Sequence, residues 1–334
     1  MPPLASQPLL GLNGALDNPS IRLLIMLVAA MLLLAGAVIG LLSALGVVRG
    51  DLRSELIKRT LAWAVLAVIV VVPILFGKLP TVLMVTIMSL LCYREFARAT
   101  GLFRDKAMSI LVVISIVAFN FAALDHWYGL FVALPPLGII VIAAVAILRD
   151  QPKGYIQRVG LAALSMLLFG ACLAHLSYFT NDVAYRAPLM LLLLCVAMND
   201  IFAFCVGKTL KGPKLAPNTS PGKTLSGAIG AVVLTTTLAA VLGPRVFRSE
   251  LHEIQHLLVM GMLVSVAGIL GDLTISSVKR DVGIKDMGVI IPGHGGVLDR
   301  CNSLLLAAPA LFHYVGYVHG IGADQPARIF TGGG

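Results

Sequence analysis

Long apolar runs alternate with short polar segments along the whole chain. A membrane-spanning helix needs about 20 mostly apolar residues, and the pattern predicts ten such helices. Their approximate limits are residues 22–45, 60–77, 79–93, 107–125, 128–148, 160–179, 187–206, 226–244, 256–275 and 303–320. The expected fold is therefore an all-α integral membrane protein with about ten transmembrane helices.

The polar segments divide the chain into two regions. Residues 1–185 hold about six spans, and residues 186–334 hold the remaining spans and two polar loops, 207–225 and 276–302. We expect the second region to be catalytic. The segment CYREFARATG, residues 92–101, is interpreted as the end of the third span, with cations that extend toward the lipid headgroups, and no chemistry is assigned to it.

Composition agrees with a membrane protein. Of the 334 residues, 58% are hydrophobic and 12% are charged, whereas a soluble domain carries about 25% charged residues. The five cysteines form no CxxC pair and mostly lie in or beside apolar runs, so they indicate buried thiols rather than disulfides or a zinc site. The first apolar run is too long for a signal peptide and is expected to be a span.

Basic residues fall in alternate loops. Of the 25 lysines and arginines, all but Arg22, Lys78, Arg186, Arg245, Arg248 and Arg328 lie in loops that follow odd-numbered spans. The positive-inside rule places these loops in the cytoplasm and both termini outside, which predicts a multi-pass protein of the cell (inner) membrane. Membrane lipid is the expected partner of these cations. Because no aromatic residues are interleaved with them, no nucleic acid partner is expected.

The loop between the seventh and eighth spans carries lysines without nearby acids. It reads GKTLKGPKLAPNTSPGKT, and no Asp or Glu occurs between Asp200 and Glu250. Such lysines beside hydroxyl groups suit a polyphosphate, although an ordinary cytoplasmic loop explains them equally well. The GKT that begins at Gly222 is not a Walker A motif, because Pro217 stands where that motif needs a glycine.

Acids stand near the cytoplasmic ends of the seventh and ninth spans. Asp200 is the first, and Asp272 is followed at helical spacing by Ser276, Lys279 and Arg280 on the same face. An acid at the edge of a membrane helix indicates a functional site. Helix capping or contact with lipid headgroups is the simpler alternative, and the acids that follow Asp272 argue against it.

A glycine-rich segment, PGHGGVLDR, follows the ninth span. Its glycines allow the backbone to approach a ligand and to direct N–H groups at phosphate oxygens, and His294 between them can hydrogen-bond a phosphate. Oxygen ligands of the kind that bind Mg²⁺ alongside substrate phosphates come from Asp272, Asp286 and Asp299. These residues predict phosphoryl or nucleotidyl transfer at the cytoplasmic face of the membrane.

The two polar loops resemble the motifs of the phosphatidate cytidylyltransferase family, also called CDP-diacylglycerol synthases. The family signature matches Ser276, Lys279, Arg280, Lys285, Asp286, Pro292, His294, Gly295, Gly296, Asp299 and Arg300. A second motif matches Lys214, Pro217, Ser220, Pro221, Lys223 and Thr224. We call residues 276–300 the signature segment. The resemblance covers roughly the C-terminal half of the chain.

The resemblance implies transfer of a cytidylyl group from CTP to phosphatidate, which gives CDP-diacylglycerol and pyrophosphate for phospholipid synthesis. It implies Mg²⁺ held by Asp272 and Asp299, with Asp200 and Asn302 as further candidates, and it allows a second cation nearby. The expected catalytic residues are Lys279, Arg280, Lys285, Asp286, His294 and Arg300. The expected substrate-binding residues are Lys208, Lys214, Ser220, Lys223, Thr224, Ser276, Gly295 and Gly296.

Three positions depart from the family pattern. Asn302 stands where an Asp is usual, Ile275 where a Glu is common, and Ser226 where a Glu usually follows the second motif. An amide lacks the charge that holds a cation, although Asn302 can equally be a cap of the tenth span. These departures are consistent with a divergent branch of the family.

Two other functions fit parts of the sequence. A CTP-dependent lipid or polyprenol kinase needs the same lysines, metal and membrane face, and it releases CDP rather than pyrophosphate. A transporter is the second alternative, but charges are nearly absent from the middle of the spans, where ion pathways place them. A homodimer is also compatible with the sequence.

Overall fold

The computed structural model describes residues 9–12, 14–182, 184–247, 249–290, 295–319 and 328–332. Within them, ten helical segments are long and apolar enough to cross a membrane, which confirms the predicted all-α membrane fold. The α-helices are α1 (Pro19–Ala44), α2 (Gly50–Phe76), α3 (Lys78–Thr100), α4 (Lys106–Leu124), α5 (Tyr128–Leu148), α6 (Tyr155–Ser165), α7 (Leu173–Tyr178), α8 (Arg186–Leu210), α9 (Leu225–Val246), α10 (Ile254–Asp281), α11 (Leu298–Cys301) and α12 (Leu304–His319). The other elements are η1 (Ala15–Asp17), η2 (Leu102–Arg104), the π-helix η3 (Met166–Cys172), η4 (Phe179–Asn181), η5 (Ser249–His252) and the strands β1 (Lys214–Ala216) and β2 (Ser220–Thr224).

Several helices continue beyond the predicted limits. α2 begins at Gly50 rather than near residue 60, and its polar first part contains an ion pair between Glu55 and Arg59, one turn apart. Such pairs stabilise a helix outside the apolar run. α10 likewise continues to Asp281, so the start of the predicted loop 276–302 is helical. The predicted loop 207–225 contains the antiparallel hairpin β1–β2.

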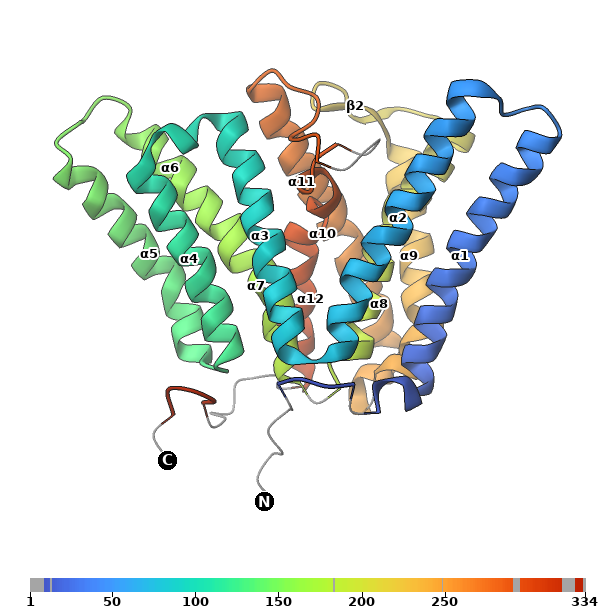
Figure 1. Ribbon diagram of the computed structural model, residues 1–334, viewed down its shortest axis with the longest axis horizontal. Coiled ribbons are helices and arrows are strands. Elements are labelled where there is room, and N and C mark those ends of the chain that lie inside the picture. The colour runs from blue at the N-terminus through green and yellow to red at the C-terminus, as the bar shows by residue number, and fades with distance from the viewer. Residues whose placement is uncertain are drawn as a thin grey trace.

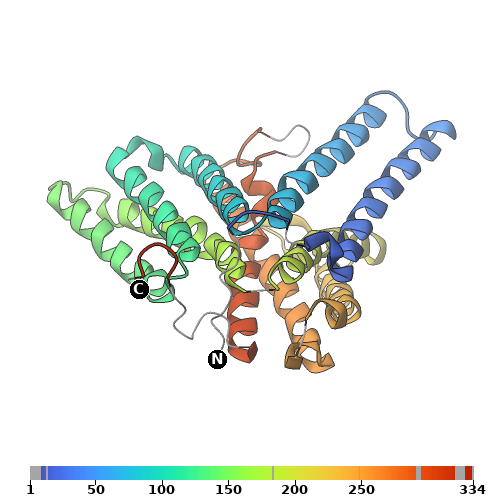
Figure 2. The same cartoon turned by 60° about the horizontal axis from the view of Figure 1, so that its bottom comes forward.

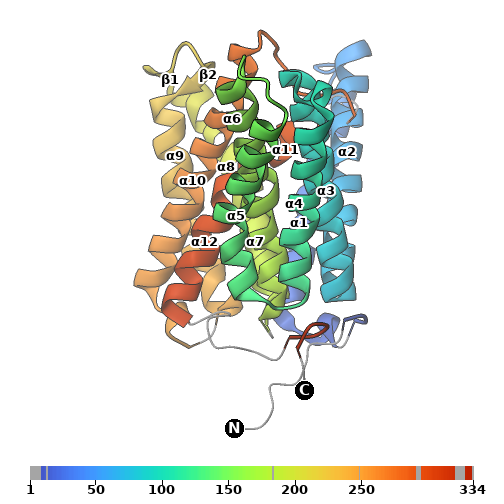
Figure 3. The ribbon, with the colours of Figure 1, turned by 90° about the vertical axis from the view of Figure 1, so that its left-hand side faces the viewer.

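The two ends of the helical bundle differ. The hairpin β1–β2 and residues 282–290, which follow α10, lie at one end, together with the other basic loops that follow odd-numbered spans (Figures 1 and 3). The first described residues and the last described residues lie at the opposite end. We call these the loop end and the terminal end.

Helices α1 and α2 form a hairpin that diverges from the other helices toward the loop end (Figures 1 and 2). Only 6% of the most apolar stretch of each helix is buried inside the protein. Both helices therefore present most of their apolar surface outward, as lipid-facing helices do.

Helices α8, α9 and α10 are fixed to one another by the buried side chain of Asn199. Its Oδ1 accepts hydrogen bonds from Thr235 on α9, at 3.1 Å, and from Ser265 on α10. Interhelical hydrogen bonds of this kind satisfy polar groups that lipid cannot satisfy.

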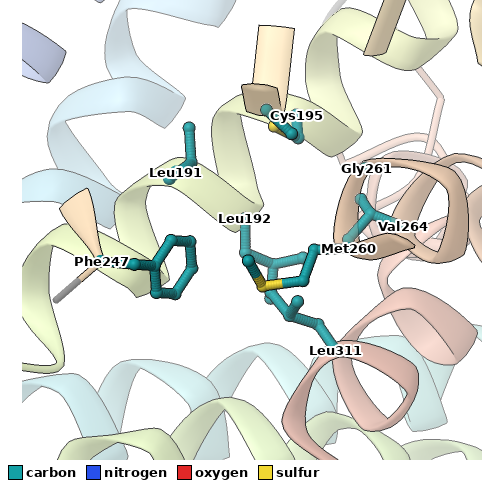
Figure 4. Close-up of a pocket in the computed structure, with 9 residues that line it drawn as sticks. Leu191, Leu192, Cys195, Phe247, Met260, Gly261, Val264 and Leu311 are labelled. Carbon is teal, nitrogen blue, oxygen red and sulfur yellow. The ribbon is translucent and has the colours of Figure 1, made fainter. Parts of the chain in front are cut away.

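A cavity of about 20 Å³ near these helices is lined by apolar side chains such as Leu192 and Met260 (Figure 4). It lacks polar partners for a water and is a packing gap.

Candidate active site

Polar side chains from several elements meet toward the loop end. Asp200 comes from α8, Lys223 from β2, Asp272 from α10, and Asn302 and Ser303 from the break between α11 and α12. Lys223 forms an ion pair with one oxygen of Asp272, and Asn302 Nδ2 donates to the other oxygen at 2.6 Å. Ser303 Oγ donates to the Asp200 carboxylate at 3.4 Å. We call these five residues the polar cluster.

The β-hairpin brings Lys223 to an acid that is distant in the sequence. The expectation that the lysines of this loop lack an acidic partner is wrong for Lys223, because Asp272 of α10 supplies one. The end of the hairpin is fixed by Thr224, whose Oγ1 accepts a hydrogen bond from Gly227 N at 3.1 Å and caps α9. Thr224, a predicted substrate ligand, therefore has a capping contact in the structure.

Asp299 is buried in α11 and accepts three hydrogen bonds. Lys279 Nζ donates to Oδ1 at 2.9 Å. The backbone N–H groups of Met287 and Gly296 donate to Oδ2 at 2.9 and 3.0 Å. The carboxylate therefore joins α10, the residues that follow it and α11 into one unit, and the predicted catalytic Lys279 and the predicted metal ligand Asp299 are paired with each other.

Glu95 of α3 is a contact of the signature segment that sequence reasoning missed. Its side chain is only 4% exposed, and its two oxygens accept hydrogen bonds from Val297 N at 3.0 Å and Leu298 N at 2.9 Å. A Cβ added to Gly288 or Gly296 would overlap the Glu95 carboxylate. Residues 92–101, for which the sequence predicted no chemistry, therefore contain the acid that holds the residues leading into α11. The available signal was an acid directly after the apolar run of the third span, at the edge of a membrane helix.

Two other predicted residues of α10 make contacts at its loop end, one within the helix and one beyond it. Ser276 Oγ lies 3.5 Å from Asp272 Oδ1, to which it donates. Arg280 donates to the carbonyl oxygens of Thr219 and Ile284, each at 3.2 Å. Arg280 therefore fastens the turn of the β-hairpin to the end of α10, beside the polar cluster.

The remaining predicted residues lie on the surface of this end or outside the described residues. The Nζ atom of Lys208 lies over the ring of Phe204, 5.0 Å from the ring centroid. Gly295 has a φ of 81°, a left-handed conformation that favours glycine. Exposed or partly exposed side chains are those of Lys208, Lys214, Ser220, Lys285, Asp286 and Arg300. His294 lies outside the described residues.

An apolar groove of about 360 Å³ extends from the polar cluster. Its charged end contains Asp200 and Arg300, and its walls come mainly from α1, α2, α3 and α8. Apart from this end, the side chains that line it are almost entirely apolar. The groove therefore joins a charged site to an apolar channel of the kind that lipid chains occupy.

The polar cluster suits Mg²⁺. No group of three or more His, Cys, Asp or Glu that could hold a metal occurs among the described residues. Mg²⁺ does not need such a group, because it is usually held by one or two carboxylates, several waters and substrate phosphates. Asp200 and Asp272 are close enough to interact electrostatically, and the side chains of Asn302 and Ser303 lie beside them.

Comparison with known proteins places these observations in a family context. Residues 57–318 match the model of the cytidylyltransferase family. The chain is 34% identical over 196 residues to the uncharacterized protein YnbB of Escherichia coli, covering 57% of this chain and 65% of that protein. It is 35% identical over 199 residues to a phosphatidate cytidylyltransferase of Brucella melitensis, covering 59% of this chain and 71% of that protein. It is 29% identical over 271 residues to a phosphatidate cytidylyltransferase of Bacillus subtilis, covering 78% of this chain and 97% of that protein.

Proposed function

Since this chain belongs to the cytidylyltransferase family, we propose that it transfers a cytidylyl group from CTP to phosphatidate and releases pyrophosphate. The observation that carries this proposal is the junction of the polar cluster with the apolar groove. A water-soluble triphosphate needs cations, and the apolar chains of phosphatidate need a channel that water does not fill. The two requirements meet where Arg300 and Asp200 end the groove.

In the proposed reaction, a phosphate oxygen of phosphatidate attacks the α-phosphorus of CTP. A bond forms between them as the bond from the α-phosphorus to the pyrophosphate oxygen breaks, which yields CDP-diacylglycerol and pyrophosphate. Lys223 and Arg300 bind and orient the two phosphates, since ammonium and guanidinium groups pair with phosphate oxygens. The signature segment holds Arg300 in place through the contacts of Asp299 with Lys279 and backbone N–H groups.

We also propose Mg²⁺ as the cofactor, with Asp272 and Asp200 as its carboxylate ligands. When bound, Mg²⁺ neutralises charge that develops on the phosphate oxygens. Asp272 is held in place by Asn302, and its carboxylate has to exchange the ammonium group of Lys223 for the cation, which leaves that ammonium group for a substrate phosphate. For Asp299 to be a ligand as well, its carboxylate has to exchange the ammonium group of Lys279 for the cation.

Product analysis tests the proposed function. Purified protein is incubated with radiolabelled CTP, Mg²⁺ and phosphatidate in detergent, and lipids and nucleotides are separated by chromatography. We expect label in CDP-diacylglycerol and release of pyrophosphate, both dependent on phosphatidate. CDP together with a newly phosphorylated lipid would identify a CTP-dependent kinase. The absence of both CDP-diacylglycerol and a phosphorylated lipid would contradict an enzyme of this class.

We propose that the loop end faces the cytoplasm, because it carries the basic loops. Cysteines placed at Thr219 and Val282 in a Cys205→Ser background should therefore resist an impermeant thiol reagent in intact cells and react after lysis. A cysteine at Asp17, at the terminal end, is the matched control and should react without lysis. Reaction of the first two positions in intact cells would reverse the orientation.

Asn302 should tune the need for Mg²⁺. Its amide donates to Asp272, and an aspartate at this position would instead place a second negative charge against that carboxylate. We expect Asn302→Asp to lower the Mg²⁺ concentration for half-maximal activity, with little change at saturating Mg²⁺, because the added charge attracts the cation. Superimposable Mg²⁺ titrations of the two proteins would show that Asn302 acts only as a structural link between the α11–α12 break and α10.

A further inference from the structure

Helix α1 supplies one wall of the apolar groove although it lies outside the family match. The match begins at residue 57, whereas α1 ends at Ala44. The groove is lined from α1 by Leu24, Val28, Met31, Leu32 and Ala35. At 3.6 residues per turn these positions form one face of the helix. This chain therefore has a groove wall that precedes the family's matched segment.

The groove is closed near the terminal end. Its lining there includes Leu24, Ile74 and Leu189, whose side chains are at most 1% exposed. The described N-terminal segment crosses this end (Figure 1), where Gly11 N donates to the carbonyl of Phe76 at 2.8 Å. A chain that enters from the charged end therefore meets a floor.

The length of the groove matches a lipid chain. Leu189 at the floor and Asp200 at the charged end both lie on α8, and at 1.5 Å per residue they are about 16 Å apart along the helix. One leaflet of the hydrocarbon core is about 15 Å thick. A fatty-acyl chain of a membrane phospholipid thus spans the groove when its phosphate lies beside Arg300.

We propose that the groove binds an acyl chain of the phosphatidate substrate and that Leu24 of α1 helps to set the longest chain that fits. This inference rests on the proposed function. The occupant follows from the two ends of the groove: a cation at one end pairs with a phosphate, and an apolar floor at the other end contacts a terminal methyl group. A groove that only contacts bulk bilayer lipid needs neither a cation at one end nor a floor at the other.

Tryptophan substitutions on α1 test the floor. Leu24→Trp fills the floor, and Val28→Trp places the same bulk one turn closer to the charged end. The matched control is Leu33→Trp, because Leu33 is 75% exposed and lies on the opposite side of the helix. Rates of CDP-lipid formation are measured with dioctanoyl, dilauroyl and dipalmitoyl phosphatidate in mixed micelles, after each protein is shown to be monodisperse and folded.

We expect Leu24→Trp to lower the ratio of dipalmitoyl to dioctanoyl turnover about ten-fold, the effect of excluding about two methylene groups. Val28→Trp should also reject the dilauroyl substrate, and it carries the test alone if Leu24→Trp does not fold. Leu33→Trp should keep the parental ratio within about two-fold.

Two results separate the failure of this inference from the failure of the proposed function. An unchanged chain-length profile in both folded groove variants, with normal CDP-lipid formation by the parent protein, overturns the inference alone. Absence of a CDP-lipid product from the parent protein with every chain length overturns the proposed function, and with it the inference.

Discussion

Asp272→Asn is expected to lower the rate of CDP-diacylglycerol formation by about 10²-fold or more, because loss of even an outer partner of a metal ligand costs about 10–100-fold. The variant removes the charge that pairs with Lys223 and that would hold Mg²⁺. Initial rates at saturating CTP, measured over a range of Mg²⁺ concentrations, check this. Thermal unfolding in detergent should change little, because the amide can still accept from Asn302.

Two comparison variants make the result specific to this carboxylate. Asp281→Asn changes an exposed acid at the end of the same helix and should be silent. Asp299→Asn should also reduce turnover, but with a lower unfolding temperature, because Asp299 is buried and accepts three hydrogen bonds. Near-parental turnover of Asp272→Asn at limiting Mg²⁺ would remove Asp272 from the cation site.

Glu95→Ala is expected to reduce kcat about 10- to 100-fold, the range seen when groups that position the ligands of a metal are lost. The substitution leaves the buried N–H groups of Val297 and Leu298 without their acceptors, at a cost of about 1–3 kcal/mol each. The backbone that leads to Asp299 and Arg300 then shifts. Glu95→Gln keeps one acceptor oxygen and should recover part of the rate.

A double-mutant cycle with Gly288 distinguishes positioning from general destabilisation. In the parent protein, Gly288→Ala places a Cβ against the Glu95 carboxylate and should reduce activity. In the Glu95→Ala background this overlap is gone, so the second substitution should cost little more. Glu55→Ala, which removes an exposed acid of α2, is the control and should keep full activity. Losses that simply add would show that Glu95 does not act through the signature segment.

The membrane fold could be predicted because apolar runs report directly which residues lie in lipid. The ends of the helices were predicted less accurately, because hydropathy marks the edge of the bilayer and not the last hydrogen bond of a helix. The ion pair of Glu55 with Arg59 continues α2 through a polar stretch that the prediction left outside the span.

The candidate site was predictable by residue type and only partly by contact. The motif residues indicated that Lys223, Asp272 and Asp299 belong to one site, but not that Asp299 pairs with Lys279 while Lys223 pairs with Asp272. These pairings depend on how the β-hairpin and α11 pack against α10, and the local sequence does not specify that packing. The contact of Glu95 with α11 joins two separate regions of the chain and was missed for the same reason.

The contact between Glu95 and α11 also imposes an order on biosynthesis. Val297 lies 202 residues after Glu95, so a ribosome that adds ~5–20 residues per second needs about 10–40 s to supply it. During that interval Glu95 has not yet met the N–H groups of Val297 and Leu298. It lies near the end of α3, where interfacial water can hydrate its carboxylate. The contact can form only after the first residue of α11 has been synthesised. A chain that stops before α11 would therefore contain most of its membrane helices and no finished site.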